Sequence, residues 1–411
     1  MHKLIKNSAL LMLCQIGGMF IPLVELPILT RNLNPSEYGS LIYVISAALL
    51  ASVFIEFGFT FSASRRIAEA ENDKEIIGYI CSDVLLAKMI LSIISLVFLY
   101  VFIIFSNNII IPFEWVILIF VMSISMGFSP IWYFIGIERL AIPAILDLSI
   151  RSIGLLSLYY FLPIYQAPET ALIIMASVGF INTLIPSLIM MRNIHLKRFS
   201  ISRAFLLLKE SFHLFIFKSV NSVQQSISSL LLGRLGSSQM VGLFAPAEKL
   251  NRAVIGLMTP LVNVFFPFFI KTRMKDEKQF TTIFIIFSIL TFVALCIGSV
   301  VIYYFADLVM DLIFGNNYQS SILILQILVI GIPFKGLNIV LNIMWFVPYS
   351  KELLVNKILL GNLLLLSLLA YFIIPLYGSI GFAIGLVLIE ILMTIILLIC
   401  AYQISISKHK G

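Results

Sequence analysis

Basic side chains recur inside long apolar stretches of this chain, each with polar neighbours at helical spacing. At 3.6 residues per turn, the members of each set lie on one side of a helix. Cationic groups turned toward a shared cavity could bind an anion such as a phosphate or a pyrophosphate. The three polar stripes are Lys218, Asn221, Gln225 and Ser228; Glu248, Arg252, Thr259 and Asn263; and Lys335, Asn338 and Asn342.

The predicted anion site consists of six basic residues. Lys218, Lys249, Arg252 and Lys335 would hold the anion, with Arg31 and Arg234 near the outer mouth of the cavity. Other interpretations stay open. Glu248 and Arg252 could form an internal ion pair, which would leave Lys249 or Lys335 as the net charge. Lys335 could instead extend to the membrane surface, and the two outer arginines could be interface anchors.

Acidic residues in apolar stretches suggest a second function, the binding of a coupling ion. A charged side chain in the centre of a membrane helix is costly and is usually functional or paired. We therefore take Glu25, Glu56 and Asp147 as candidates for binding H⁺ or Na⁺. Asp147 could equally form an ion pair with Arg151, four residues later, and Glu390 could simply bond a neighbour.

The sequence contains no recognisable catalytic constellation. It lacks the GxxxxGK[ST] loop of nucleotide-hydrolysing proteins, the HExxH motif and a nucleophile elbow. Its four cysteines and four histidines are scattered without metal-ligand spacing. We therefore expect no catalytic residues, no metal, no cofactor and no disulfide framework, and we do not expect an enzyme.

Composition indicates an all-α integral membrane protein. Hydrophobic residues make up 61% of the 411 residues and charged residues only 11%, too few to cover a soluble protein of this size. The net charge of +7 is explained by Lys and Arg in cytoplasmic loops, so nucleic acid is not an expected partner. The first apolar run follows basic residues but continues to about Leu29, so we interpret it as a retained membrane span.

Twelve apolar segments predict about twelve transmembrane helices. They run roughly over 8–29, 39–60, 84–105, 114–135, 144–164, 169–191, 213–234, 241–269, 281–305, 321–346, 354–376 and 378–402. The longest basic connector, 192–212, separates two six-helix lobes. We assign residues 1–200 to the N-terminal lobe with this connector and residues 201–411 to the C-terminal lobe. Lys and Arg then alternate between the two sides, which predicts that both termini are cytoplasmic.

A weak internal repeat suggests that the two lobes are pseudo-symmetric around the central cavity. Arg31 and Gly39 precede Arg234 and Gly242 by 203 positions, and Pro130 precedes Pro333 by the same number. Parallel six-helix repeats are common in transporters. The stretch 22–39 is therefore predicted to be a kinked helix end followed by a turn, with Arg31 and Arg234 as the only basic residues on the outer side.

Four stretches carry a family resemblance that covers most of the chain. They are Pro27-Ile-Leu-Thr-Arg31 through Tyr38-Gly39; Phe57-Gly-Phe59 leading to Ser64-Arg-Arg66; Pro130-Ile-Trp132-Tyr-Phe134-Ile-Gly136; and Gly242-Leu-Phe244 with Ala247-Glu-Lys249-Leu250. With these motifs the chain resembles the Wzx-type O-antigen flippases. Those belong to the polysaccharide-exporter branch of the superfamily that also contains the MATE drug exporters and the lipid II flippase MurJ.

The resemblance implies a flippase of the bacterial inner membrane. Its substrate would be an undecaprenyl-pyrophosphate-linked oligosaccharide, and alternating access coupled to H⁺ or Na⁺ would move it. Membrane lipids, a polysaccharide polymerase and a chain-length regulator are then the expected partners. Two alternatives are a MATE-like exporter of small molecules, which would favour an acidic cavity, and a membrane polymerase or ligase, which usually has a large outer loop.

Overall fold

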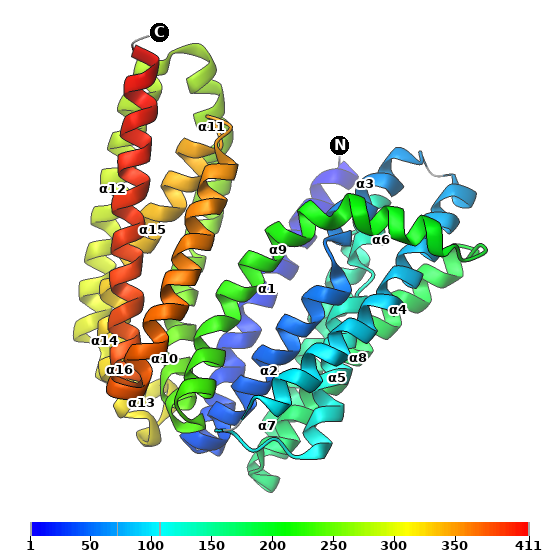
Figure 1. The fold of residues 1–411 in the computed structure, drawn as a ribbon, viewed down its shortest axis with the longest axis horizontal. Helices are drawn as coiled ribbons and strands as arrows, with labels where there is room; N and C mark the ends of the chain where they lie inside the picture. The colour runs from blue at the N-terminus through cyan, green and yellow to red at the C-terminus, as the bar shows by residue number, and fades with distance from the viewer. Residues whose placement is uncertain (1, 72, 107, 410–411) are drawn as a thin grey trace. The chain divides into compact units, whose positions relative to one another are not determined.

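The computed structural model describes residues 2–71, 73–106 and 108–409, and within these ranges its regular secondary structure is helical. The side chains of some helical residues, including Gln15, Lys218 and Asn221, lie outside the described part. The chain divides into two compact units, Met1–Gln239 and Met240–Gly411 (Figure 1). Each unit is described by itself below.

The described residues contain nine helical segments that are long and apolar enough to cross a membrane. They are Pro35–Glu69, Lys74–Ile104, Phe113–Gly136, Ala141–Tyr165, Pro168–Asn193, Ser238–Lys275, Glu277–Tyr304, Ser320–Phe346 and Glu352–Ser405. This confirms an all-α, multi-pass membrane protein. The count of twelve spans and the cytoplasmic location of both termini stay predictions.

The N-terminal unit is built around α2. Its helices are α1 (His2–Asn32), α2 (Pro35–Glu56), α3 (Phe59–Glu69), α4 (Lys74–Ile104), α5 (Phe113–Phe128), α6 (Ile131–Gly136), α7 (Ala141–Tyr165), α8 (Pro168–Asn193) and α9 (Ile201–Leu235). Helix α2 packs against α4, α5, α8 and α9, while α1 packs mainly against α7. Three alanines of α2 are fully buried: Ala47, Ala48 and Ala51. Because their side chains are small, neighbouring helices can approach α2 closely.

Local sequence sets both ends of α2. The Asn34 side chain accepts a hydrogen bond from the Glu37 N–H, and the Glu37 carboxylate accepts one from the Asn34 N–H. This capping box, with Pro35 at the first helical position, begins the helix. At the other end, Phe57 and Gly58 both have positive φ angles, which turns the chain into α3.

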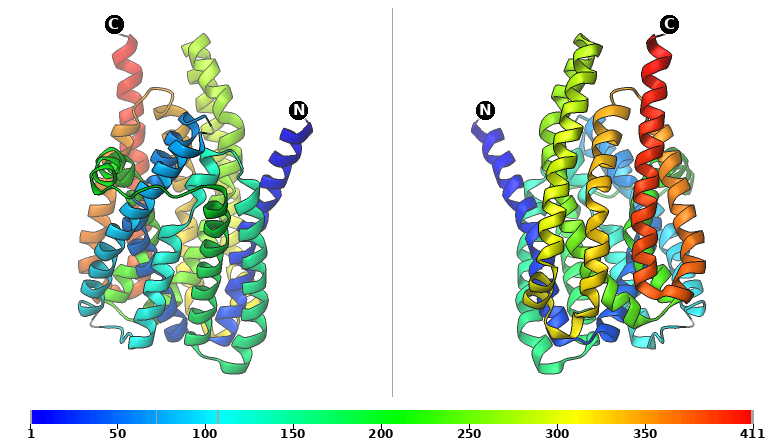
Figure 2. Two further views of the ribbon diagram at one scale, coloured as in Figure 1. Left: turned by 90° about the vertical axis from the view of Figure 1, so that its right-hand side faces the viewer. Right: turned by 90° about the vertical axis from the view of Figure 1, so that its left-hand side faces the viewer.

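Helix α9 belongs to the N-terminal unit by its packing. The Ser200 hydroxyl caps its first turn, so residues 201–212 of the predicted basic connector are helical. These first turns are seen end-on in the left view of Figure 2, whereas α4 and α5 stand upright. The Phe215 ring stacks on that of Phe57, with ring centroids 4.4 Å apart. The predicted lobe boundary at 200/201 thus coincides with the start of α9, and the compact unit extends further, to Gln239.

The C-terminal unit contains seven α-helices and a π-helical turn among its described residues, and some of these helices are short or kinked. They are α10 (Ser238–Gly256), α11 (Met258–Lys275), α12 (Glu277–Tyr304), α13 (Ala306–Phe314), α14 (Ser320–Ile330), α15 (Ile332–Val340), the π-helical turn Leu341–Phe346 and α16 (Glu352–His409). Helix α16 is divided by Gly378, whose φ of 59° and ψ of −148° are not helical. This kink falls at the boundary predicted between the last two segments.

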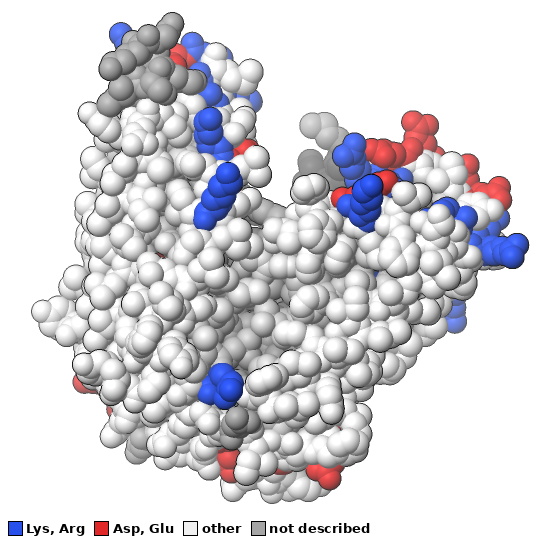
Figure 3. Space-filling model, in the orientation of Figure 1, with Lys and Arg blue, Asp and Glu red and all other residues white. Residues whose placement is uncertain are grey.

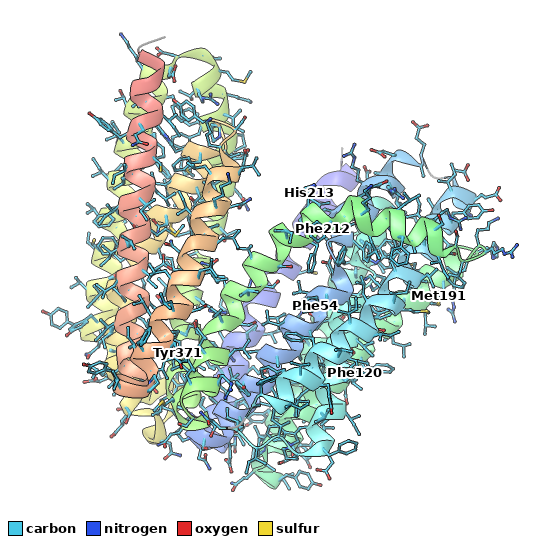
Figure 4. All side chains as sticks on the ribbon, in the orientation of Figure 1. Phe54, Phe120, Met191, Phe212, His213 and Tyr371 are labelled. Atoms are coloured by element: carbon cyan, nitrogen blue, oxygen red, sulfur yellow. The ribbon has the colours of Figure 1, made fainter. Side chains whose placement is uncertain are left out.

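Aromatic side chains form much of the core of the C-terminal unit. Phe280 on α12 stacks on Trp345 of the π-helical turn with ring centroids 5.4 Å apart, and Phe284 packs against the same ring at a tilt, 4.7 Å away. Phe269 on α11 meets both phenylalanines edge to face. These rings join α11, α12 and the π-helical turn into one cluster. Figure 4 draws the described side chains of both units on the ribbon and labels Phe54 and Phe212 of the N-terminal unit.

Candidate functional site

Lys335 on α15 forms an ion pair with Glu390 on α16. The Lys335 Nζ lies 3.7 Å from Glu390 Oε1. About one third of the lysine side chain and 18% of the glutamate side chain are exposed. The glutamate therefore neutralises a lysine that the sequence had assigned to anion binding.

A polar network fixes the position of the Glu390 carboxylate. Asn338 Nδ2 donates to Glu390 Oε2 at 3.0 Å, and Thr394 Oγ1 donates to Asn338 Oδ1 at 2.9 Å. Both Asn338 and Thr394 are buried. Asn338 was predicted to lie on the same polar stripe as Lys335, and the two do act on one carboxylate.

Helix α10 carries Glu248, Lys249 and Arg252. Arg252 Nη2 donates to Glu248 Oε1 at 2.8 Å, so the ion pair left open by the sequence is present. Lys249 is half-buried. Among the five charged side chains considered in this unit, Lys249, Arg252 and Lys335 exceed Glu248 and Glu390 by one positive charge. The surplus of cations is therefore smaller than the stripes alone suggested.

Arg31 and Arg234 occupy equivalent positions, each in the last turn of a helix, α1 and α9 respectively. Positive side chains are favourable at this end of a helix dipole. The two turns that follow contact one another, because Ser36 Oγ and Ser238 Oγ are 2.6 Å apart. Asn108 Nδ2 also donates to the Arg234 carbonyl at 2.9 Å. The placement agrees with the predicted repeat, and a function at an outer mouth stays a prediction.

The acidic candidates have different environments. The Glu56 carboxylate accepts the N–H groups of Gly58 and Thr60, both at 2.9 Å, and so stabilises the start of α3. Asp147 accepts from Arg151 Nε at 2.7 Å, which confirms the ion pair considered from the sequence. Asn182 also donates to Asp147. Glu25 is half-buried in α1 between Pro22 and Pro27.

The remaining anion candidate, Lys218, lies in α9, but its side chain is outside the described residues. The six basic candidates are thus distributed between the two units. Lys218, Arg31 and Arg234 belong to the first unit, and Lys249, Arg252 and Lys335 belong to the second.

Lys88, a fully buried cation in α4, was not among the residues predicted from the sequence. Its ammonium donates to the carbonyls of Gly127 and Ser129 at 2.7 and 3.3 Å, and it lies 5.8 Å from the centre of the Trp132 ring. Pro130 interrupts the helix here and cannot donate a backbone hydrogen bond. A lysine in one apolar run and a proline break in another could have suggested this pairing.

A second missed group clamps the connector between α8 and α9 onto α4. Arg203 Nε donates to the buried Asp83 at 2.8 Å, and Lys197 Nζ donates to Glu75 at 2.8 Å. Both cations lie over the Tyr79 ring. The hydrogen bond to Asp83 raises the pKa of Arg203, and the one to Glu75 raises the pKa of Lys197.

In the face shown in Figure 3, a large group of charged residues of the N-terminal unit lies at one end, a smaller acidic group lies at the opposite end, and the flanks between them are largely uncharged. The end with the larger group includes α3 and the first turns of α9, where Arg65, Arg66 and Glu210 are located. Such a distribution is expected of helices whose sides contact lipid.

The family comparison extends over most of the chain. Residues 4–273 match the model of the family described as "Polysaccharide biosynthesis protein". The chain belongs to this family. A curated relative from Escherichia coli (strain K12), named "Putative O-antigen transporter", is 25% identical over 407 residues, which cover 96% of this chain and 95% of the relative. This relative is named a transporter rather than an enzyme, as expected here.

Solved structures place this family member in a transporter fold. A MATE family multidrug resistance transporter of the MOP superfamily, in its inward-facing conformation, gives a TM-score of 0.73 at 16% identity, covering 95% of this chain and 94% of that one. The lipid II flippase MurJ gives 0.72 at 15% identity, covering 97% and 87%. At this identity the likeness concerns the fold alone.

Proposed function

We propose that this protein is a flippase for a lipid-linked oligosaccharide. The substrate would be an undecaprenyl-pyrophosphate-linked repeat unit of O-antigen or a similar surface polysaccharide, moved across the bacterial inner membrane. The observation that carries the proposal is the nearly end-to-end match to the Escherichia coli relative, in a chain of this membrane fold.

The chemistry of the charged residues supports an anionic head group as the part that the protein recognises. Lysine and arginine are the usual ligands of phosphate oxygens, and arginine can bind two of them at once. Lys249, Arg252 and Lys335 leave an excess positive charge in the C-terminal unit after the two acids are counted. Lys218, Arg31 and Arg234 would complete the set, while uncharged polar groups would contact the sugars.

Transport would proceed by alternating access and would draw on an ion gradient. Glu25, Glu56 and Asp147 are the candidates for binding H⁺ or Na⁺. Because the Glu56 carboxylate accepts two backbone N–H groups at the start of α3, its neutralisation would also disturb the local fold. Glu25 and Asp147 are therefore the first choices for neutralisation, as Glu25→Gln and Asp147→Asn.

The test is restoration of surface O-antigen in a flippase-deficient strain. Lys218, Arg252 and Lys335 are each changed to Gln, and normal membrane levels of every variant are verified. Each neutralisation should reduce surface polysaccharide severalfold, because a cation that contacts pyrophosphate is lost. Lys351→Gln, an exposed lysine in the same unit as Lys335, is the matched control and should restore the wild-type level. Full activity in all three variants would refute the anion site.

A second experiment separates flipping from the alternatives. The purified protein is reconstituted into liposomes that contain a fluorescent undecaprenyl-pyrophosphate-linked oligosaccharide, and exposure of the sugar to an outside glycosidase is followed. Protein-dependent exposure supports the flippase. Resistance of cells to cationic drugs without exposure of the sugar would instead indicate a MATE-like exporter.

A further inference from the structure

Lys335 and Glu390 form an open ion pair. A direct N–H···O bond to a carboxylate has a length of about 2.7–2.9 Å, whereas Lys335 Nζ and Glu390 Oε1 are 3.7 Å apart. The ion pair of Arg252 with Glu248 is closed by comparison, because Arg252 donates to Glu248 at 2.8 Å. The Lys335 ammonium is thus attracted to Glu390 without being hydrogen-bonded to it.

The two partners differ in how firmly they are held. Glu390 Oε2 accepts from Asn338, and Asn338 is oriented in turn by Thr394. The glutamate therefore keeps its position whether or not the lysine is present. Lys335 has the long, rotatable side chain typical of lysine and is the more exposed partner of the pair. It can turn toward another anion without breaking a direct hydrogen bond.

Because Glu390 is fixed and Lys335 is mobile, Glu390 and an incoming anion compete for the Lys335 ammonium. The energy of a charge pair falls only as the inverse of distance, so Glu390 attracts Lys335 at 3.7 Å as a rival to any incoming anion. An anion that bonds directly to the ammonium gains a charge-assisted hydrogen bond that Glu390 does not make. After the anion leaves, the fixed carboxylate draws the ammonium back.

We propose that Glu390 is a built-in competitor that sets the affinity of Lys335 for the anionic head group of the substrate and promotes its release. Glu390 is thus a positioning residue, and it acts through Lys335. The inference rests on the proposed function, since it takes the substrate to be a phosphate-containing anion. Asn338 and Thr394 contribute to the same function, because they hold the Glu390 carboxylate where it makes no direct hydrogen bond to Lys335.

The test measures binding of inorganic pyrophosphate to the purified full-length protein in detergent, by calorimetry. Glu390→Gln keeps the side-chain size and the acceptor for Asn338 but removes the charge. It should bind pyrophosphate about five- to tenfold more tightly, since the competing charge is gone. Lys335→Gln should bind it more weakly. In the Lys335→Gln background, Glu390→Gln should have little additional effect, because the two residues act as a pair.

Three further variants make the result specific. Asn338→Leu frees Glu390 to bond Lys335 directly, so pyrophosphate binding should weaken, opposite to Glu390→Gln. Thr394→Val should do the same to a smaller extent. Glu352→Gln is the matched control, because it removes the same charge from the first turn of α16. It should leave pyrophosphate binding unchanged.

Transport gives a readout that a purely structural function would not produce. If Glu390 promotes release, Glu390→Gln should bind more tightly yet flip the lipid-linked oligosaccharide more slowly in liposomes. Equal or weaker pyrophosphate binding by Glu390→Gln, or a tightening that persists without Lys335, would overturn the inference. If the wild-type protein flips the oligosaccharide while this occurs, the proposed function stands. If the wild-type protein does not flip the oligosaccharide, the proposed function fails. The pyrophosphate-binding measurements on the single and double variants still show whether Glu390 acts through Lys335.

Discussion

The Lys88 ammonium on α4 lies 2.7 Å from the Gly127 carbonyl oxygen, one residue before the end of α5. It also donates to the Ser129 carbonyl at 3.3 Å. Both acceptors lie where Pro130 prevents the helix from continuing. The positive charge therefore stabilises the carbonyl end of a broken helix inside the N-terminal unit, where the Lys88 side chain is fully buried.

Replacing Lys88 with Met should destabilise the protein. The two carbonyls would lose their donor in a buried position, at a cost of about 1–3 kcal/mol for each unsatisfied group, partly offset because a charge is no longer buried. Thermal unfolding in detergent would measure the change. Lys74→Met, at the exposed start of the same helix, should have little effect. A Lys88→Met variant as stable as the wild type would contradict this function.

Gly58→Ala should loosen the packing of α9 on the turn between α2 and α3. Gly58 has a φ of 78°, and a Cβ there would lie 2.9 Å from the backbone nitrogen of Phe215. We expect a loss of at least about 1 kcal/mol from the backbone angle, and more from the contact. Gly18→Ala is the control, because a Cβ added at this position in α1 would have no neighbour within 4 Å. Protease sensitivity of α9 would reveal the loosening.

Asp83→Asn should weaken the clamp between the α8–α9 connector and α4. The Asp83 side chain is only 8% exposed, and the half-exposed Arg203 is its partner, so we expect a loss of about 1 kcal/mol. A double-mutant cycle with Arg203→Met isolates the pair. The largely exposed pair of Arg65 and Glu69 provides the comparison, and Glu69→Gln should change stability by less than about 0.5 kcal/mol.

Tyr349 should make stability depend on alkaline pH. Burial and the hydrogen bond from its hydroxyl to Glu277 raise the pKa of Tyr349 from 10.0 to about 12. A raised pKa favours the protonated phenol in the native state, so this stability is complete below pH 10 and is lost as the pH approaches 12. The wild-type melting temperature should fall more steeply than that of Tyr349→Phe in this interval. Parallel curves would exclude the effect.

Composition and periodicity predicted the membrane class, because a long apolar run by itself indicates that the segment lies in an apolar environment. Helical spacing also suggested the ion pair of Asp147 and Arg151 as one alternative, since residues four apart share a helix face, and this pair is present. The start of α9 at Ile201 was harder to predict from the sequence, because the first turns of this helix contain as many basic residues as a connector would. Amphipathic turns at a membrane surface lack the continuous apolar run by which spans are recognised.

The tertiary partners of charged side chains within the helices could not be predicted from one sequence. Glu390 follows Lys335 by 55 positions, and no local rule connects them. The stripe rule grouped Lys335 with Asn338 correctly, but it could not indicate that both would face a carboxylate on α16. The hydrogen bond from Lys88 to the Ser129 carbonyl could not be predicted either. Its acceptor is a backbone carbonyl, which every residue has and which leaves no pattern in the sequence.

The kink in α16 has a genetic consequence. At φ 59° and ψ −148°, Gly378 occupies a region of backbone space that is essentially restricted to glycine. Every missense change of a glycine codon introduces a side chain, so no amino-acid replacement at this codon is conservative. Codon 378 is thus a point where selection should remove nearly all missense alleles, although the residue itself contributes no functional group.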